Sequence, residues 1–152
     1  MPTKSKRRTR KRRRRSSVTV QRAGGAAPSA ALLRRYALAA ASPGAQLTLR
    51  VVGAAESKRL NSVFRRRKHA TNVLSFRYQE RPVAGDVVLC HPVIAKEAAS
   101  QGKTLAAHYA HLVVHGMLHL RGHDHLRKSD AARMERAEIR ILRRLGFGNP
   151  YE

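Results

Sequence analysis

The chain contains, at residues 115–125, the stretch HGMLHLRGHDH. On an α-helix, residues four apart lie on the same face one turn from each other, so His115 and His119 can point at a common centre. Gly122 offers a break after this helix, and a chain that turns there can bring His125 back toward the pair. Three imidazoles leave the fourth position of a tetrahedral zinc ion open to water or substrate, which is typical of catalytic zinc. We therefore expect one Zn²⁺ ion held by His115, His119 and His125.

The histidine cluster is larger than one metal ion needs. Six of the eight histidines fall within residues 108–125, and a helix would project four of them from one side. His111 and His115 are as well spaced as His115 and His119, so spacing alone leaves the ligand set open. A polar helix face and a nucleic-acid contact surface are alternative explanations. Only the second pair lies close enough to Gly122 to recruit a histidine from the next turn, which favours the triad given above.

Gly116 argues against one familiar use of a histidine pair. In the metallopeptidase helix, a glutamate directly follows the first histidine and acts as general base on the metal-bound water. Glycine has no side chain that could take a proton. The sequence therefore disfavours a peptidase.

The chain is strongly basic, with 32 Lys and Arg against nine Asp and Glu and a formal net charge of +23. Such a balance is typical of proteins that bind polyanions, and nucleic acid is the natural partner. Residues 4–15 alone contain ten Lys or Arg. We expect residues 1–16 to form a disordered basic tail, because they are too charged and too poor in apolar groups to fold. The tail either promotes solubility or adds salt-sensitive phosphate contacts to RNA.

Length and composition indicate one folded unit after the tail, at residues 17–152. The chain of 152 residues, 42% of them hydrophobic, is long enough for a single domain with its own core. It has no run of about 18 apolar residues that could span a bilayer, and its basic N-terminus lacks the apolar stretch of a secretory signal. Cys90 is the only cysteine, so no intrachain disulfide can form, and we expect it to be buried. These features predict a cytoplasmic protein without a membrane partner.

The hydrophobic pattern predicts an α+β fold, with a small mixed four-stranded sheet and about five helices packed against it. Thr104 is a good N-cap for the helix that carries the histidines. Apolar residues surround that helix on most sides, so we expect it to be central, buried and at the floor of a cleft. The order of the strands does not follow from the pattern. The expected strands are 18–22, 46–52, 71–78 and 86–89, and the expected helices are 28–41, 56–65, 92–101, 105–121 and 129–145.

Three blocks of the chain resemble the YbeY family of bacterial metal-dependent endoribonucleases. The run 115–125 looks like the family signature, and residues 60–65 (LNSVFR) and 71–76 (TNVLSF) resemble its arginine-bearing helix and the strand after it. GDVVL at 85–89 matches a third block. The resemblance covers about residues 45–145. It implies the same α+β architecture and a zinc-dependent, single-strand-specific endoribonuclease, which acts in maturation of the 3′ end of small-subunit ribosomal RNA and in ribosome quality control.

The resemblance also implies residue roles and partners. It implies that Arg65, His115 and His119 are catalytic. The implied role of Arg65 is to stabilise the extra negative charge of a phosphorane-like transition state. The implied partners are RNA, above all ribosomal RNA and the small ribosomal subunit, together with ribosomal or GTPase proteins. Neutral imidazoles leave a zinc ion its full charge to polarise a phosphoryl oxygen and activate water. The nucleophile, water or the RNA 2′-hydroxyl, stays open because the sequence shows no obvious general base.

Two positions depart from the family pattern. The family usually carries an aromatic residue where this chain has His123, which adds a competing candidate ligand beside His125. Residues 66–70 (RRKHA) are unusually basic, where the family more often has an acidic residue and a proline. This difference puts the usual shape of the loop after Arg65 in question. The alternative function is a non-catalytic ribosome-associated RNA-binding protein with a structural zinc site, which a closed four-ligand set would favour.

Overall fold

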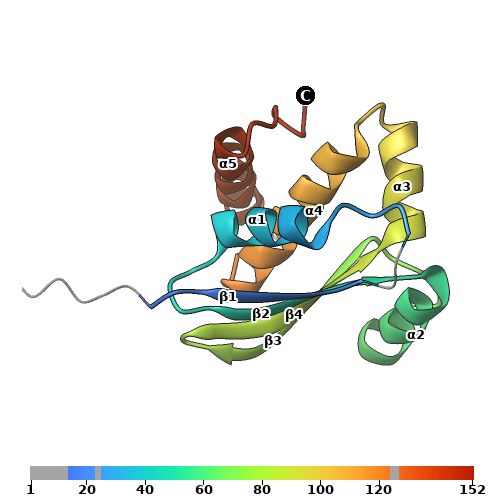
Figure 1. Cartoon of the computed structure of the whole chain (residues 1–152), viewed down its shortest axis with the longest axis horizontal. Helices are drawn as coiled ribbons and strands as arrows, with labels where there is room; N and C mark the ends of the chain where they lie inside the picture. Colours follow the sequence, from blue (N-terminus) through green and yellow to red (C-terminus); the bar gives the residue numbers. More distant parts are fainter. Residues whose placement is uncertain (1–13, 23–24, 124–126) are drawn as a thin grey trace, which may run out of the picture.

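The computed structural model describes residues 14–22, 25–123 and 127–152. These ranges hold five helices and four strands, which confirms the predicted α+β class and the four-stranded mixed sheet (Figure 1). The elements follow in the order β1 (Ser17–Arg22), α1 (Ala30–Ala40), β2 (Gln46–Val52), α2 (Ala54–Arg65), β3 (Val73–Glu80), β4 (Val83–Cys90), α3 (His91–Ser100), α4 (Leu105–Leu120) and α5 (Lys128–Arg144).

The sheet has the strand order β1-β2-β4-β3. The β1–β2 and β2–β4 pairs are parallel, and β3 runs antiparallel to β4, with Phe76 opposite Asp86 in the register. β3 is therefore an edge strand. The backbone N–H and C=O groups on its outer side can therefore form hydrogen bonds with side chains beside the sheet.

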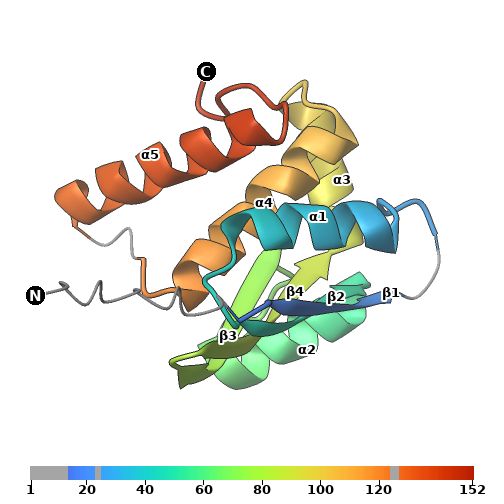
Figure 2. The same ribbon diagram turned by 60° about the vertical axis from the view of Figure 1, so that its left-hand side comes forward.

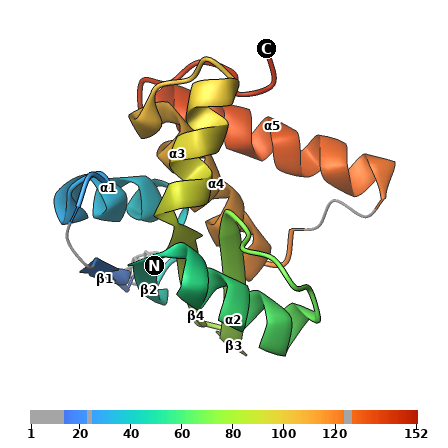
Figure 3. The same ribbon diagram turned by 90° about the vertical axis from the view of Figure 1, so that its right-hand side faces the viewer.

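Helices cover the two faces of the sheet unequally. α1 and α4 lie over one face, and α2 lies beneath the other (Figures 1 and 3). α5 crosses α4 on the side away from the sheet (Figure 2). α4 is thus enclosed by the sheet, α1, α3 and α5, and ten of its 16 residues are buried, which confirms that it is the central helix. The largest fully buried side chains include Leu33, Leu49, Leu89, Ile94, Tyr109, Met117, Leu118, Leu120, Met134 and Leu142.

Most element boundaries lie one or two residues from the predicted ones, and the start of β4 differs most. β4 begins at Val83 rather than at residue 86, because β3 and β4 form a tight hairpin whose pairing extends to Glu80 and Val83. Pro82 and Gly85 flank this start, and both residue types are uncommon inside strands, so the sequence pattern hides it. α5 begins at Lys128, one residue before the predicted start at Ser129.

The last residue of β4 and the segment before β1 also bear on the predictions. Cys90 is buried and free, as expected. The predicted tail lies mostly outside the described residues, but its last part contacts the loop after α1. There the backbone N–H of Gly44 donates to the Arg14 carbonyl (3.0 Å), and the Ser16 hydroxyl donates to the Ser42 carbonyl (2.7 Å). Within the described ranges, no helix combines the length and apolar character that a membrane crossing requires.

Candidate metal centre

α4 places the histidines by ordinary helix geometry. The hydroxyl oxygen of Thr104 accepts a hydrogen bond from the backbone N–H three residues later (3.1 Å), so the helix begins where the sequence predicts. It ends in a Schellman motif, in which the backbone N–H groups of Gly122 and His123 donate to carbonyls of the last turn, both at 3.0 Å. Gly122 has a φ of +91°, a backbone conformation that residues other than glycine rarely adopt. The chain therefore turns shortly after His119, as predicted.

His115 and His119 converge on one point. Their Nε2 atoms lie 3.1 Å apart. Nδ1 of His115 lies 3.1 Å from Oε1 of Glu138, and because a carboxylate oxygen accepts hydrogen bonds, Nδ1 donates; in the neutral imidazole, Nε2 then carries the lone pair that a metal needs. Nitrogen ligands about 2.0–2.1 Å from a tetrahedral zinc ion lie about 3.3–3.4 Å from each other. The two nitrogens therefore fit adjacent ligand positions on one zinc ion.

The third predicted ligand, His125, lies outside the described residues. His123, the competing candidate, lines a separate pocket next to Arg121 and Arg133. Burial, together with the positive charges of these two arginines and of Arg140, lowers the pKa of the His123 imidazole. The described residues thus hold two members of the predicted triad and place His123 apart from them.

Glu138 is a carboxylate on α5 of which only 1% is exposed. Its Oε1 accepts from His115, and its Oε2 accepts from His111 (2.6 Å) and from the hydroxyl of Tyr151 (2.8 Å). Burial raises the pKa of Glu138, but the hydrogen bonds from His111, His115 and Tyr151 outweigh burial and hold the pKa at about 2. Glu138 is therefore an ionised carboxylate that orients both imidazoles.

A second set of ligands also meets the distance requirement for a metal. His111, His115 and Glu138 each offer one ligand atom, and these atoms all lie within 4.8 Å of one another. In this set Glu138 would bind the metal instead of orienting a ligand. The hydrogen bonds from His111, His115 and Tyr151 engage both carboxylate oxygens, so a metal ion there would displace them. The His115–His119 pair needs less rearrangement.

A cleft of about 690 Å³ contains the histidine pair. Arg65 ends α2 and reaches the same cleft, where its Nη2 donates to the carbonyl of Ser75 at 3.0 Å. A guanidinium with one donor engaged retains others for an anionic ligand. The structure therefore brings Arg65 together with His115 and His119. The residues that line the cleft are Arg65, Thr71, Asn72, Val73, Leu74, Ser75, Arg77, His115, His119 and Leu120.

The sequence profile of one protein family, described as Endoribonuclease YbeY, matches residues 17–146, which is most of the chain. The chain belongs to the YbeY family. Endoribonucleases are hydrolases that cleave phosphodiester bonds within RNA, and the resemblance seen in the three sequence blocks is confirmed.

Curated YbeY relatives match most of this chain. An endoribonuclease YbeY of Aromatoleum aromaticum is 56% identical over 119 residues, which are 78% of this chain and 77% of the relative. Another, from Nitrosomonas europaea, is 50% identical over 119 residues and is matched over 73% of its length. A third, from Azoarcus, is 52% identical over 127 residues, but the match spans only 50% of that longer relative.

A solved structure shares the fold of this YbeY-family chain. The solution structure of a Thermotoga maritima protein superposes with a TM-score of 0.59 and covers 90% of this chain and 99% of its own. The sequence identity is 20%, so this similarity concerns the fold alone.

Gly116, within the YbeY-like signature, has a packing role. A Cβ atom at this position would lie 2.9 Å from Cγ1 of Val87 and 3.1 Å from Oγ of Ser75. The Ser75 hydroxyl also donates to the Gly116 carbonyl at 3.2 Å. Glycine thus lets α4 approach β3 and β4 closely, at the position where the metallopeptidase helix carries its general base.

Sequence reasoning missed Glu138 and Tyr151. The sequence does carry a signal for Glu138, because it falls on the same face of α5 as the buried Met134 and Ile141. A carboxylate on the apolar face of an amphipathic helix requires a buried partner. Tyr151 gives no such signal, since it lies beyond the last helix and approaches Glu138 only in the folded chain.

Proposed function

We propose that this YbeY-family chain is a single-strand-specific, zinc-dependent endoribonuclease of the cytoplasm, which matures the 3′ end of small-subunit ribosomal RNA and takes part in ribosome quality control. The observation that carries the proposal is the pair of Nε2 atoms of His115 and His119, 3.1 Å apart in a cleft that also contains Arg65. The net charge of +23 supports RNA as the substrate. The proposed partners are ribosomal RNA, the small ribosomal subunit and ribosomal or GTPase proteins. This part of the proposal rests only on the resemblance to the YbeY family.

Three residues of the cleft, together with His125 and Glu138, have proposed roles. His115, His119 and His125 hold one zinc ion, and Glu138 fixes the ring of His115 so that Nε2 points toward the metal. When bound, zinc supplies a Lewis acid that polarises the scissile phosphoryl group. The guanidinium of Arg65 donates to the phosphoryl oxygens, whose negative charge increases in the transition state.

A non-catalytic RNA-binding protein with a structural zinc site is the second candidate function. The group of His111, His115 and Glu138 favours it, because these side chains could hold a metal against the buried carboxylate of Glu138. A metal site closed by a fourth protein ligand leaves no position for water or a phosphoryl oxygen. Such a protein would bind RNA and leave it intact.

Cleavage of a precursor RNA that contains the 3′ end of the small-subunit RNA tests the proposed function. We expect the purified protein to cleave it and His119→Ala to lose cleavage, because two histidines rarely hold a catalytic zinc. Arg65→Ala should bind zinc normally and cleave about 10²–10³-fold more slowly, the loss typical of one transition-state donor.

The matched control for Arg65→Ala is Arg35→Ala, an exposed arginine of α1 outside the cleft. This control should cleave like the unaltered protein. Equal cleavage by the unaltered protein and by His119→Ala would contradict the proposal. RNA binding without cleavage by any of the proteins would favour the second candidate.

A further inference from the structure

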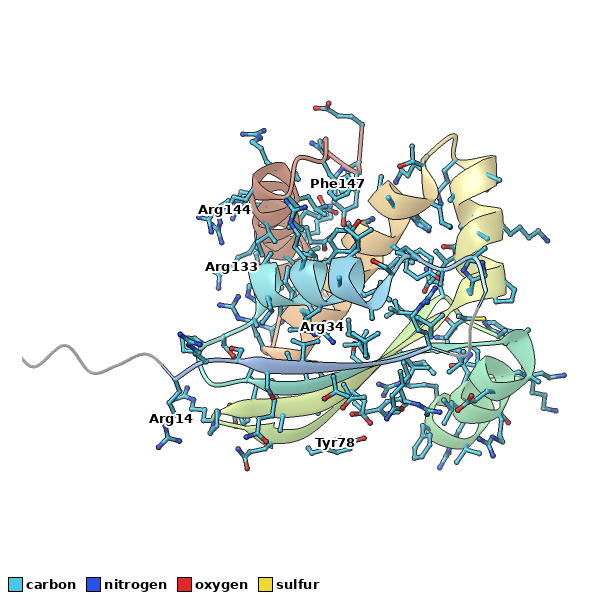
Figure 4. All side chains as sticks on the ribbon, in the orientation of Figure 1. Arg14, Arg34, Tyr78, Arg133, Arg144 and Phe147 are labelled. Carbon is cyan, nitrogen blue, oxygen red and sulfur yellow. The ribbon has the colours of Figure 1, made fainter. Side chains whose placement is uncertain are left out.

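Large apolar side chains are exposed around the end of α2 and along β3. Phe64 is 59% exposed, and Val63 and Tyr78 are 67% and 70% exposed. Tyr78 lies on the side of the sheet away from α1 and α4 (Figure 4), which is the side that α2 covers (Figure 1). A group of exposed apolar side chains on one side of a protein marks an interaction surface more strongly than a single one does.

The ring of Phe64 packs against Phe76 of β3. The ring centroids are 5.2 Å apart and the planes are inclined by 67°, an edge-to-face contact. Phe76 in turn packs against the buried cluster of Val52, Leu74 and Val88. Phe76 is thus held in place by the core, while more than half of the surface of Phe64 is exposed to solvent. Together the two rings form an aromatic surface whose position is fixed by packing.

Arg65 joins this aromatic surface to the cleft. Its Cζ lies 5.7 Å from the centroid of the Phe76 ring, and its Nη2 donates to the Ser75 carbonyl on the edge strand β3. The same side chain lines the cleft with His115 and His119. An extended ligand that leaves the cleft past Arg65 therefore reaches the two phenylalanine rings.

The chain segment around these rings is rich in positive charge, although Asp86 lies opposite Phe76 in the sheet register and accepts from the Tyr78 hydroxyl. Residues 57–78, which include both phenylalanines, contain seven Lys or Arg and no Asp or Glu. Among the described residues, none of these seven cations forms a salt bridge with a carboxylate. Single-stranded RNA matches this chemistry, because its bases stack on aromatic rings and its phosphates pair with cations. An acidic protein would satisfy the charges but has no flat bases for the rings.

We propose that Phe64 and Phe76, beside Arg65, form a stacking site for a base of the single-stranded RNA that flanks the scissile bond. This inference rests on the proposed endoribonuclease function. Stacking uses the π-face that every base has, so the site selects unpaired RNA over duplex without reading the sequence.

Binding of a short single-stranded RNA, measured by fluorescence anisotropy, tests the stacking site. Phe64→Ala and Phe64→Leu should each weaken binding about tenfold, the loss expected for one stacked base. Phe64→Tyr keeps an aromatic ring and should bind like the unaltered protein. The control is Leu38→Ala, which removes an apolar side chain that is 44% exposed on α1 and should leave RNA binding unchanged.

A second ligand separates stacking from charge and from simple apolar contact. An RNA backbone of the same length without bases should bind the unaltered protein and Phe64→Leu equally. Equal affinity of these two proteins for the ordinary RNA would overturn the stacking site, since it would mean that the ring contributes nothing beyond its apolar surface. Circular dichroism checks that each variant is folded.

The stacking site and the proposed nuclease function can be tested separately. Binding is measured without cleavage. If the protein does not cleave RNA, and Phe64→Tyr binds RNA more tightly than Phe64→Leu, the proposed nuclease function is refuted and the stacking site is supported. A protein that cleaves normally and ignores all three Phe64 substitutions would support the nuclease and refute the stacking site.

Discussion

Glu138 orients His115 through Nδ1, and the cleft uses Nε2 of the same ring. A buried ionised carboxylate is costly unless several donors surround it, and here His111, His115 and Tyr151 supply them. Glu138 therefore belongs to the candidate metal centre, although it does not line the cleft. The sequence motif of residues 115–125 gives no hint of it, because the carboxylate lies on the next helix and meets the histidines only when α5 packs on α4.

Replacing Glu138 by glutamine should lower the affinity for zinc about 10–100-fold, the usual effect of losing a carboxylate that orients a ligand histidine. The amide keeps the shape of the side chain but has only one acceptor oxygen for three donors. A competition titration with a chromogenic chelator measures the change. Glu135→Gln, an exposed position on the same helix, should leave the affinity unchanged, and an equal loss in both variants would contradict the role given to Glu138.

α4 lies closer to the sheet than most side chains would permit at Gly116. A Cβ atom there would lie 2.9 Å from Val87 and 3.1 Å from Ser75, which leaves no room for even a methyl group without movement. The close approach puts His115 and His119, on the same helix, at the wall of the cleft that β3 lines. The packing of this helix and the geometry of the site are therefore linked.

Gly116→Ala should lower the free energy of unfolding by about 1–3 kcal/mol, the usual cost of overpacking a core. In a domain of this size, each kcal/mol lowers Tm by about 2–4 °C. Thermal unfolding followed by circular dichroism measures the shift. Gly148→Ala is the matched control, since a Cβ there meets no atom within 4 Å; a Tm of Gly116→Ala equal to that of this control would contradict the packing role.

Helices and strands could be predicted because their signals are local. Thr104 and Gly122 delimit α4 by capping chemistry that the sequence displays directly. The order β1-β2-β4-β3 could not be predicted, because the antiparallel position of β3 at the edge depends on pairing between distant segments. Helical spacing predicted that His115 and His119 share one face of α4, and their Nε2 atoms do lie close together. Their role as metal ligands stays a prediction, as does that of His125, which lies outside the described residues.

Positive charge is spread over both the folded part of the protein and its N-terminal segment. Residues 1–13 contribute eight Lys or Arg, and the remainder of the chain is still strongly basic. Binding of a basic protein to RNA releases counterions, so affinity falls as salt concentration rises. The two parts can therefore be separated by the steepness of that dependence.

Deleting residues 1–13 should leave the fold intact and flatten the salt dependence of RNA binding. The deletion spares Arg14 and Ser16, whose hydrogen bonds join the start of the described chain to the loop after α1. Each phosphate contact on a single strand contributes about 0.7 to the slope of log affinity against log salt, so eight cations account for up to about 6. A tail of equal length made of Gly and Ser is the control, and an unchanged slope after the deletion would show that the segment does not contact RNA.

The number of zinc ions bound per chain in His119→Gln and His111→Gln tests whether the cleft holds the metal. His115 belongs to both candidate ligand sets, so only these two positions distinguish them. We expect the unaltered protein and His111→Gln each to retain about one tightly bound zinc, and His119→Gln to lose it. Retention of zinc by His119→Gln together with its loss from His111→Gln would place the metal against Glu138 and contradict the catalytic site proposed for the cleft.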